Sequence, residues 1–306
     1  MKMSLRKDLV RIVEKYKYIE NGKVSDVVVR SNDDVFVVLG VENSAKVSKR
    51  KVGTLTMLAK GIGAKPLLVA KKSGDEELLE DVVYEKYGVA VVNLETFENI
   101  LKGNKIYIRK KKSIFTVSID SKRLKELCEE MGISMGELAN YLGVSRKSVY
   151  DYIRGNKDVS VDTAIRLAEL VGDEVLKPVN LEEFQGIELK VEPHTPLERE
   201  LMEVTDSIHV PKGNVSVGGE ARGVKFTAVV PHGDEELEWF AELSEIIDRM
   251  SVAVGYSDVP KTLENSKVKV TENLQQFLEA LSGEPVEPEG DICSTDRGRH
   301  KGSQGN

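Results

Sequence analysis

The twenty residues from Met135 to Arg154 constrain the fold more than any other part of the chain, and they read MGELANYLGVSRKSVYDYIR. Ala139 is the fifth residue of this run, Gly143 the ninth and Val149 the fifteenth. A small fifth residue lets two helices approach closely, and a glycine at the ninth lets the chain turn sharply with positive φ. The apolar fifteenth residue anchors the second helix. We therefore predict two short helices crossing at a tight turn, with further buried residues at Leu138, Leu142, Val144 and Tyr152.

This arrangement is the helix-turn-helix unit, whose second helix enters the major groove of double-stranded DNA. Ser134 and Ser145 stand where helix caps are required, and the segment VDTAIRLAELVG, residues 161–172, predicts a further amphipathic helix. With these helices, residues 113–178 resemble the Cro/C1-type helix-turn-helix domain of phage repressors. The resemblance implies an all-α bundle that binds DNA.

Two positions depart from the Cro/C1 pattern. Such domains often carry Gln at the first position of the unit, where it bonds a phosphate, but this chain has Met135. They commonly carry Glu before an Arg-Gly pair, and this chain has Ile153 before Arg154. The first departure removes one phosphate contact and leaves the fold intact.

The start of the second helix holds the candidate DNA contacts. Arg146 and Lys147 can donate to O6 and N7 of guanine, or contact phosphates alone. One turn further on, Asp151 can accept from a cytosine amino group or pair with Lys147. Serines at this helix start suit phosphate or capping roles. The predicted DNA-binding residues are Ser145, Arg146, Lys147, Ser148, Tyr150, Asp151 and Arg154, together with the preceding lysines Lys110, Lys111 and Lys112.

Charge is distributed unevenly along the chain. The net charge is −7, but residues 1–172 carry 31 Lys and Arg against 24 Asp and Glu, whereas residues 173–306 carry 13 against 27. Residues 102–125 hold nine basic side chains and one acid, Asp120. Because phosphate neutralisation supplies much of the affinity for DNA, we expect the basic run to face the duplex and the acidic C-terminal part to face away.

Mixed strand and helix patterns flank the helical segment. Residues 1–112 predict an N-terminal α/β domain, and residues 179–283 predict a C-terminal α/β domain that repeats the first in outline. The pair Gly218-Gly219 predicts a turn between two strands of the second domain. Residues 284–306 lack apolar periodicity and predict a disordered tail.

The N-terminal domain resembles the restriction-endonuclease core, whose metal site needs an Asp and a Glu-x-Lys. Asp26, at the head of a strand, could be the aspartate. The next strand ends in VLGVENS, where Glu42 is followed two residues later by Ser44 and the nearest lysine is Lys46. Since a Mg²⁺ ion and its attacking water would be poorly held, we interpret the domain as a structural form of that core.

Other chemistry finds little support in the sequence. His194, His209, His232 and His300 lack metal-ligand spacing and are expected mostly at the surface or in turns. Trp239 and Phe240 are expected in the core. Cys128 and Cys293 give no disulfide framework, and neither a secretory segment nor a membrane span is apparent, which favours the cytoplasm. We expect no metal and no cofactor.

The order of the segments resembles an archaeal family of transcriptional regulators in which a Cro/C1-type domain lies between an N-terminal α/β domain and a C-terminal extension. The resemblance implies a cytoplasmic, sequence-specific regulator that binds double-stranded DNA and is not an enzyme. Because one unit reads few base pairs, we expect a homodimer joined through the α/β domains. The alternatives are a nuclease that uses the N-terminal domain and a transcription coactivator that binds proteins through the bundle.

Overall fold

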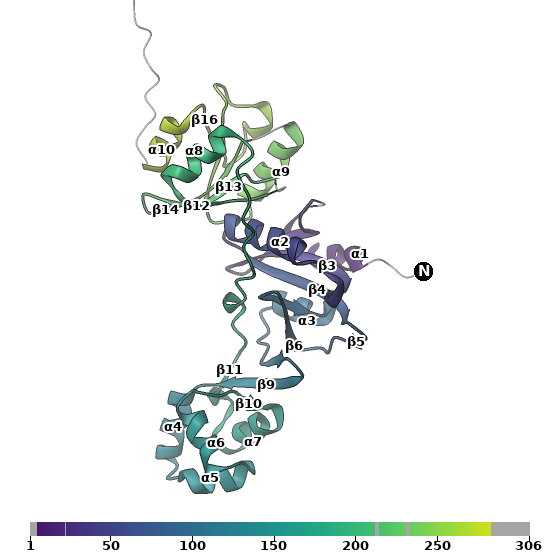
Figure 1. The fold of residues 1–306 in the computed structure, drawn as a ribbon, viewed down its shortest axis with the longest axis vertical. Coiled ribbons are helices and arrows are strands. Elements are labelled where there is room, and N and C mark those ends of the chain that lie inside the picture. Colours follow the sequence, from purple (N-terminus) through teal and green to yellow (C-terminus); the bar gives the residue numbers. More distant parts are fainter. Residues whose placement is uncertain (1–4, 22, 212–213, 231–232, 283–306) are drawn as a thin grey trace, which may run out of the picture.

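The three domains of the chain lie one after another along the long axis of the molecule (Figure 1). The structure is a computed structural model, and it describes residues 5–21, 23–211, 214–230 and 233–282. The C-terminal domain is at the top of this view, the N-terminal domain in the middle and the helical domain at the bottom. The predictions for the tail, Cys293, His232 and His300 lie outside the described residues. None of the helices in the described ranges combines the length and apolar character needed to cross a membrane.

The N-terminal domain is a mixed sheet covered by helices on both faces. In the sheet, β1, β2 and β3 are antiparallel neighbours, β4 and β7 follow in parallel, and β6 is antiparallel to β7. Alternate side chains of the strands enter two separate cores, one under α1 and α3 and the other under α2. The elements are α1 (Leu5–Val13), β1 (Lys17–Glu20), β2 (Val27–Ser31), β3 (Asp34–Asn43), α2 (Lys49–Ile62), β4 (Lys65–Ser73), β5 (Glu76–Glu77), β6 (Val82–Lys86), β7 (Val89–Val92) and α3 (Leu94–Leu101).

The helical domain is a four-helix bundle that a β-hairpin connects to the N-terminal domain. The hairpin strand β8 pairs in parallel with β6, so the sheet of the N-terminal domain continues into this part of the molecule. The all-α bundle that the Cro/C1 resemblance implies for residues 113–178 lacks this hairpin, and the predicted domain boundary before residue 113 falls in the hairpin turn, where Lys112 has φ 57°. The elements are β8 (Ile108–Lys111), β9 (Ile114–Ile119), α4 (Ser121–Glu130), α5 (Met135–Leu142), α6 (Arg146–Ile153), β10 (Val159–Ser160), α7 (Val161–Val171) and β11 (Leu176–Lys177).

The C-terminal domain repeats the core of the first, as the sequence outline predicted. Its strand order is β12-β13-β14-β15-β16, with two antiparallel pairings followed by two parallel ones. The strands β1-β2-β3-β4-β7 pair in the same directions, and in both domains one helix precedes the strands, one separates the third and fourth strands and one follows the last. The elements are α8 (Pro196–Val204), β12 (Asp206–His209), β13 (Val217–Ala221), β14 (Val224–Val229), α9 (Asp234–Ser244), β15 (Met250–Val254), β16 (Lys269–Thr271) and α10 (Leu274–Ser282).

The predicted turn at Gly218-Gly219 is wrong, because both glycines lie inside strand β13 and the turn to β14 is formed by Arg222 and Gly223. A Cβ atom at Gly218 would overlap the backbone carbonyl of Gly61, at the end of α2 in the N-terminal domain. Glycine is therefore required here by the close approach of another backbone and not by a turn.

The two α/β domains share one interface. The Thr227 hydroxyl donates to the Gly61 carbonyl at 3.1 Å, and the Trp239 indole donates to the Glu20 carbonyl at 2.9 Å. The guanidinium of Arg249 lies against the same helix end, where burial lowers its pKa. Trp239 and Phe240 belong to a core cluster that includes residues of both domains, which confirms their predicted burial.

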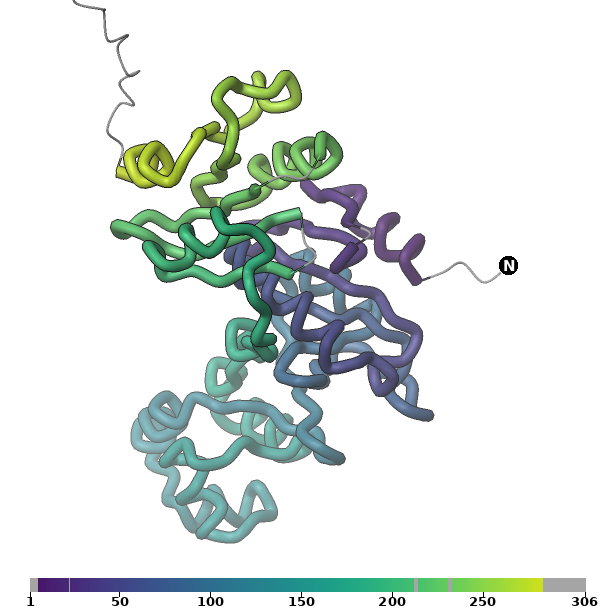
Figure 2. The backbone as a smooth tube through the Cα atoms, turned by 45° about the horizontal axis from the view of Figure 1, so that its top comes forward, coloured from purple at the N-terminus to yellow at the C-terminus, as the bar shows by residue number. Residues whose placement is uncertain are grey.

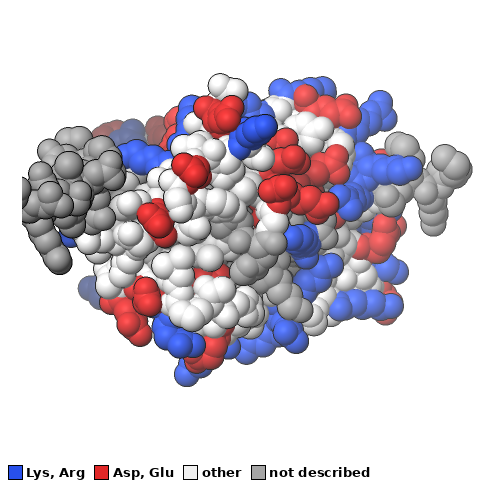
Figure 3. Space-filling model, turned by 90° about the horizontal axis from the view of Figure 1, so that it is seen from above, with Lys and Arg blue, Asp and Glu red and all other residues white. Residues whose placement is uncertain are grey.

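A linker returns from the helical domain to the C-terminal domain along the N-terminal domain (Figure 2). Phe184 is buried in the core under α1 and α3, and the Gly186 amide donates to the Gly88 carbonyl at 2.9 Å. The C-terminal domain consequently lies at the opposite end of the molecule from the helical domain (Figure 1). Figure 3 shows the molecule from that end, where single Asp and Glu side chains stand on a largely uncharged surface at the left and a group of them gathers right of the centre, with Lys and Arg beside it. The acidic part of the chain thus faces away from the helix-turn-helix, as expected.

Candidate nucleic-acid interface

Helices α5 and α6 have sharply defined ends. The Ser134 hydroxyl accepts from the Glu137 amide and the Glu137 carboxylate accepts from the Ser134 amide, which closes a capping box at the start of α5. Gly143 ends α5 with φ 68°, in the left-handed region. The Arg166 guanidinium of α7 donates to the Leu142 carbonyl at 3.1 Å and so holds the turn between the two helices.

The buried side of the unit follows the sequence pattern. The positions predicted to be small or apolar are buried, and Val144 is partly buried against the same cluster. This packing fixes α6 with its opposite side toward solvent. The buried residues are Leu138, Ala139, Leu142, Val149 and Tyr152.

The solvent side of α6 presents Arg146, Lys147 and Tyr150, which are exposed, and Asp151, which is half-buried. The Arg154 guanidinium lies 4.4 Å from the centre of the Tyr150 ring, a cation–π contact one turn along the helix. Among the described residues Lys147 and Asp151 form no ion pair, although their spacing allows one. Lys147 is therefore free to reach a ligand.

Arg146 reaches back to α5. If Gly136 carried a Cβ atom, that atom would lie 2.9 Å from a guanidinium nitrogen of Arg146. The guanidinium therefore covers the first turn of α5, beside the exposed Met135 that replaces the usual Gln. A cation thus stands next to the position where the usual phosphate contact is missing.

The two serines at the start of α6 have capping contacts. The Ser145 hydroxyl accepts from the Ser148 amide at 3.1 Å, and the two hydroxyl oxygens are 3.0 Å apart. These contacts match the capping role left open by the sequence. Their hydroxyls can still accept or donate one further bond at this exposed helix start.

The three lysines before the bundle lie on the hairpin. Lys110 forms an ion pair with Glu76 at 2.6 Å, and this hydrogen bond raises the pKa of its ammonium. Lys111 forms an ion pair with Asp158 at 2.5 Å. Lys112 is exposed in the hairpin turn. Two of the three predicted lysines therefore already hold a carboxylate.

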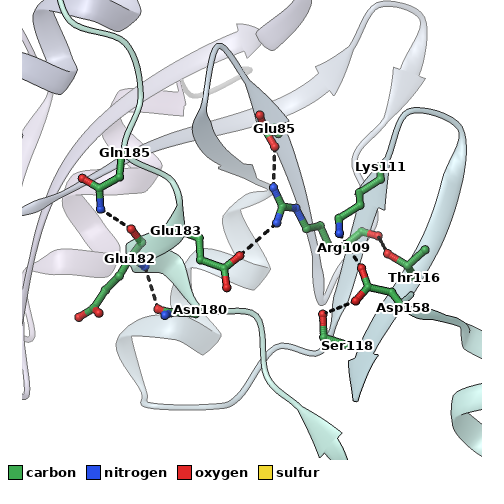
Figure 4. A network of polar contacts seen from close by, with 10 residues as sticks. All are labelled: Glu85, Arg109, Lys111, Thr116, Ser118, Asp158, Asn180, Glu182, Glu183 and Gln185. Atoms are coloured by element: carbon green, nitrogen blue, oxygen red, sulfur yellow. Dashed lines mark hydrogen bonds and ion pairs between the residues drawn. The ribbon is translucent and has the colours of Figure 1, made fainter. Parts of the chain in front are cut away.

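Arg109, which is not among the predicted site residues, fixes the junction between the hairpin, the N-terminal sheet and the linker (Figure 4). Arg109 on β8 pairs with Glu85 of β6 at 2.7 Å and with Glu183 of the linker at 3.4 Å. Its guanidinium also lies 4.5 Å from the centre of the Phe184 ring. The sequence does not reveal this role of Arg109, because the residue lies in a basic run whose lysines carry the same charge but do not contact Glu85, Glu183 or Phe184.

The aspartate of the possible nuclease site already has partners. Asp26 accepts from the Gly40 amide at 2.7 Å and lies 3.7 Å from Arg6. Glu42 pairs with Lys71 on the neighbouring strand at 3.0 Å. In the described part of the chain no three carboxylates, histidines or cysteines gather as a metal site.

One histidine departs from its predicted surface position. His209 on β12 is buried, with its Nδ1 atom 3.1 Å from the Ser216 carbonyl oxygen, and burial lowers its pKa. His194 meets its ring edge-on, with centroids 4.9 Å apart. The alternation of the short strand was the missed indication, since β12 turns His209 toward the interior.

The fold and this surface define a protein with a helix-turn-helix domain set beside a nuclease-like core. In agreement, a PD-(D/E)XK superfamily domain matches residues 2–106 and a helix-turn-helix family matches residues 124–172. No solved structure gives a significant match.

Relatives among known archaeal proteins match far beyond these two domains. A protein of Pyrococcus furiosus is 31% identical over 241 residues, which cover 78% of this chain and 70% of the relative. A protein of Pyrococcus horikoshii is 30% identical, with 78% of each chain covered. Both are named as candidate HTH-type transcriptional regulatory proteins. The chain belongs to this archaeal family.

The overlap with other relatives is shorter. A protein of Aeropyrum pernix with the same kind of name is 40% identical over 148 residues, which cover 48% of this chain and 45% of the relative. A protein of Pyrococcus abyssi is 34% identical, and 65% of its length is covered. This chain therefore spans about half to two thirds of these relatives.

Proposed function

We propose that this protein regulates transcription by binding double-stranded DNA with α6 in the major groove. The observation that carries the proposal is the exposed pair Arg146 and Lys147 at the capped start of α6, on the side opposite the buried Val149. Basic side chains at the start of a helix lie beside its free backbone amides, so both can bind the phosphates and base edges of a duplex. Enrichment of a sequence motif from a random pool of duplexes by the full chain tests this proposal.

The two cations take different roles in this proposal. Arg146 lies over the first turn of α5, so we assign it to a phosphate, in place of the contact that Met135 cannot make. Lys147 has no ion-pair partner on its own helix and reads a base edge, with O6 and N7 of guanine as the fitting acceptors. Asp151 is left to accept from a cytosine amino group.

Salt dependence separates the lysines of the hairpin from the arginine of α6. Because Lys110 and Lys111 already hold carboxylates, we expect Lys110→Gln and Lys111→Gln to leave the slope of log affinity against log salt nearly unchanged. Arg146→Ala should reduce that slope by about 1. Titrations of a labelled duplex at several salt concentrations measure both. A reduced slope in the lysine variants would instead assign them to phosphates.

We also propose that the N-terminal domain is structural and does not cleave DNA. Asp26 is occupied by the Gly40 amide and Arg6, and β3 lacks a Glu-x-Lys. The expected result is intact plasmid after incubation with the protein and Mg²⁺ or Mn²⁺. Cleavage that Asp26→Ala abolishes would overturn the assignment, whereas cleavage that Asp26→Ala leaves unchanged would indicate a contaminating nuclease.

A further inference from the structure

The two α/β domains cover each other, which leaves a different surface for self-association. Helix α2 and strands β12 and β13 face each other, and residues of α9 complete the shared core. These faces are occupied within one chain. These apolar faces are therefore not available for the dimer contacts between α/β domains that the sequence predicted.

The helical domain has an open apolar groove between α7 and the hairpin. It has a volume of about 400 Å³, and Ile108 and Val117 of the hairpin and Ala164 and Ile165 of α7 line it. Ile165 is 53% exposed. Glu169 and Asp173, both exposed, form an acidic rim.

The tip of the same hairpin has the opposite character. Ile114 is 64% exposed, the most exposed large apolar residue among those described. Lys112 is exposed two residues before it, in the turn. The tip therefore offers an apolar side chain beside a cation, and the groove offers an apolar wall beside two carboxylates.

The tip cannot enter the groove of its own chain. Ile114 and Val117 lie on one extended strand, β9, so the tip is about 10 Å beyond the hairpin residue that lines the groove. A second copy meets no such restriction. A twofold axis would place each tip in the other chain's groove and leave no further sites open.

We propose that two copies of this chain associate through their helical domains, with Ile114 of each in the α7–hairpin groove of the other and Lys112 beside Glu169. The inference rests on the proposed function only in that two recognition helices would then read two half-sites. Charge complementarity selects a copy of this chain over a generic apolar partner, because both the acidic rim and the basic tip are on the same chain.

Sedimentation of the full chain without DNA tests this surface. Ile165→Asp and Ile114→Asp should each weaken dimerisation at least tenfold. Leu79→Asp is the matched control, because Leu79 is also 53% exposed but lies in the N-terminal domain, and it should leave dimerisation unchanged. Equal effects of all three variants, or a wild-type chain that stays monomeric at high micromolar concentration, would overturn the proposal.

Charge reversal provides a second test that does not depend on a buried apolar change. Lys112→Glu and Glu169→Lys should each weaken the dimer, and the double variant should recover it, since the attraction is restored with opposite signs. An additive double variant would overturn the contact. These measurements contain no DNA, so a failure here leaves the proposed function standing, and absence of DNA binding leaves the dimer result intact.

Discussion

Gly218→Ala is expected to unfold the interface between the two α/β domains at a lower temperature than in the wild-type chain. The added Cβ atom would overlap the Gly61 carbonyl, which is backbone and cannot rotate away. Overpacking of this kind costs about 3 kcal/mol or more when the neighbour cannot move. At roughly 2–4 °C per kcal/mol for a chain of this size class, the midpoint should fall by about 6 °C or more.

Calorimetry with a second glycine variant checks that result. Gly233 has an extended backbone with φ 176°, and a Cβ atom there would have open space. Gly233→Ala should therefore cost less than about 1 kcal/mol, the scale of a changed helix cap. Equal unfolding temperatures for the two variants would contradict the close approach of β13 to the end of α2.

The helix-turn-helix could be predicted from the sequence because its requirements are local. Spacing alone specified a small residue at Ala139, a left-handed residue at Gly143 and a buried residue at Val149, and the structure confirms each position. The exposure of Arg146 and Lys147 followed from the same spacing. Their separate surroundings did not, because the contact of Arg146 with the first turn of α5 depends on the crossing of two helices.

The missed features depend on residues distant in sequence. The second strand of the hairpin has a period-two pattern in IFTVSI, residues 114–119, but the lysines directly before it predict a DNA-contacting segment, which conceals the strand pairing. Glycine is required at position 218 because of the carbonyl group of Gly61, which lies 157 residues earlier in the chain. Arg109 likewise takes its role from Glu85 and Glu183, which no spacing rule connects.

Lys147→Ala is expected to have the largest effect on specific DNA binding. Loss of a base contact should lower affinity for the preferred duplex by about 5–150-fold, equivalent to about 1–3 kcal/mol, and relax the preference at one base pair. Arg146→Ala should weaken preferred and random duplexes by the same factor, because a phosphate contact carries no sequence information.

Fluorescence anisotropy with both duplexes distinguishes these roles. Lys125→Ala is a suitable control, since Lys125 is an exposed lysine of α4 in the same bundle, paired with Glu129, and should leave both affinities unchanged. A loss of sequence preference in Arg146→Ala together with an unaltered preference in Lys147→Ala would exchange the two assignments.

The central claim is that the exposed face of α6 reads a DNA sequence. Selection of bound duplexes from a random pool by the full chain tests it most directly. We predict enrichment of a motif with two half-sites about one helical turn apart, and loss of preference at one position of each half-site for Lys147→Ala. Recovery of a pool with no enriched motif, by a protein that sediments as a folded species, would contradict the account.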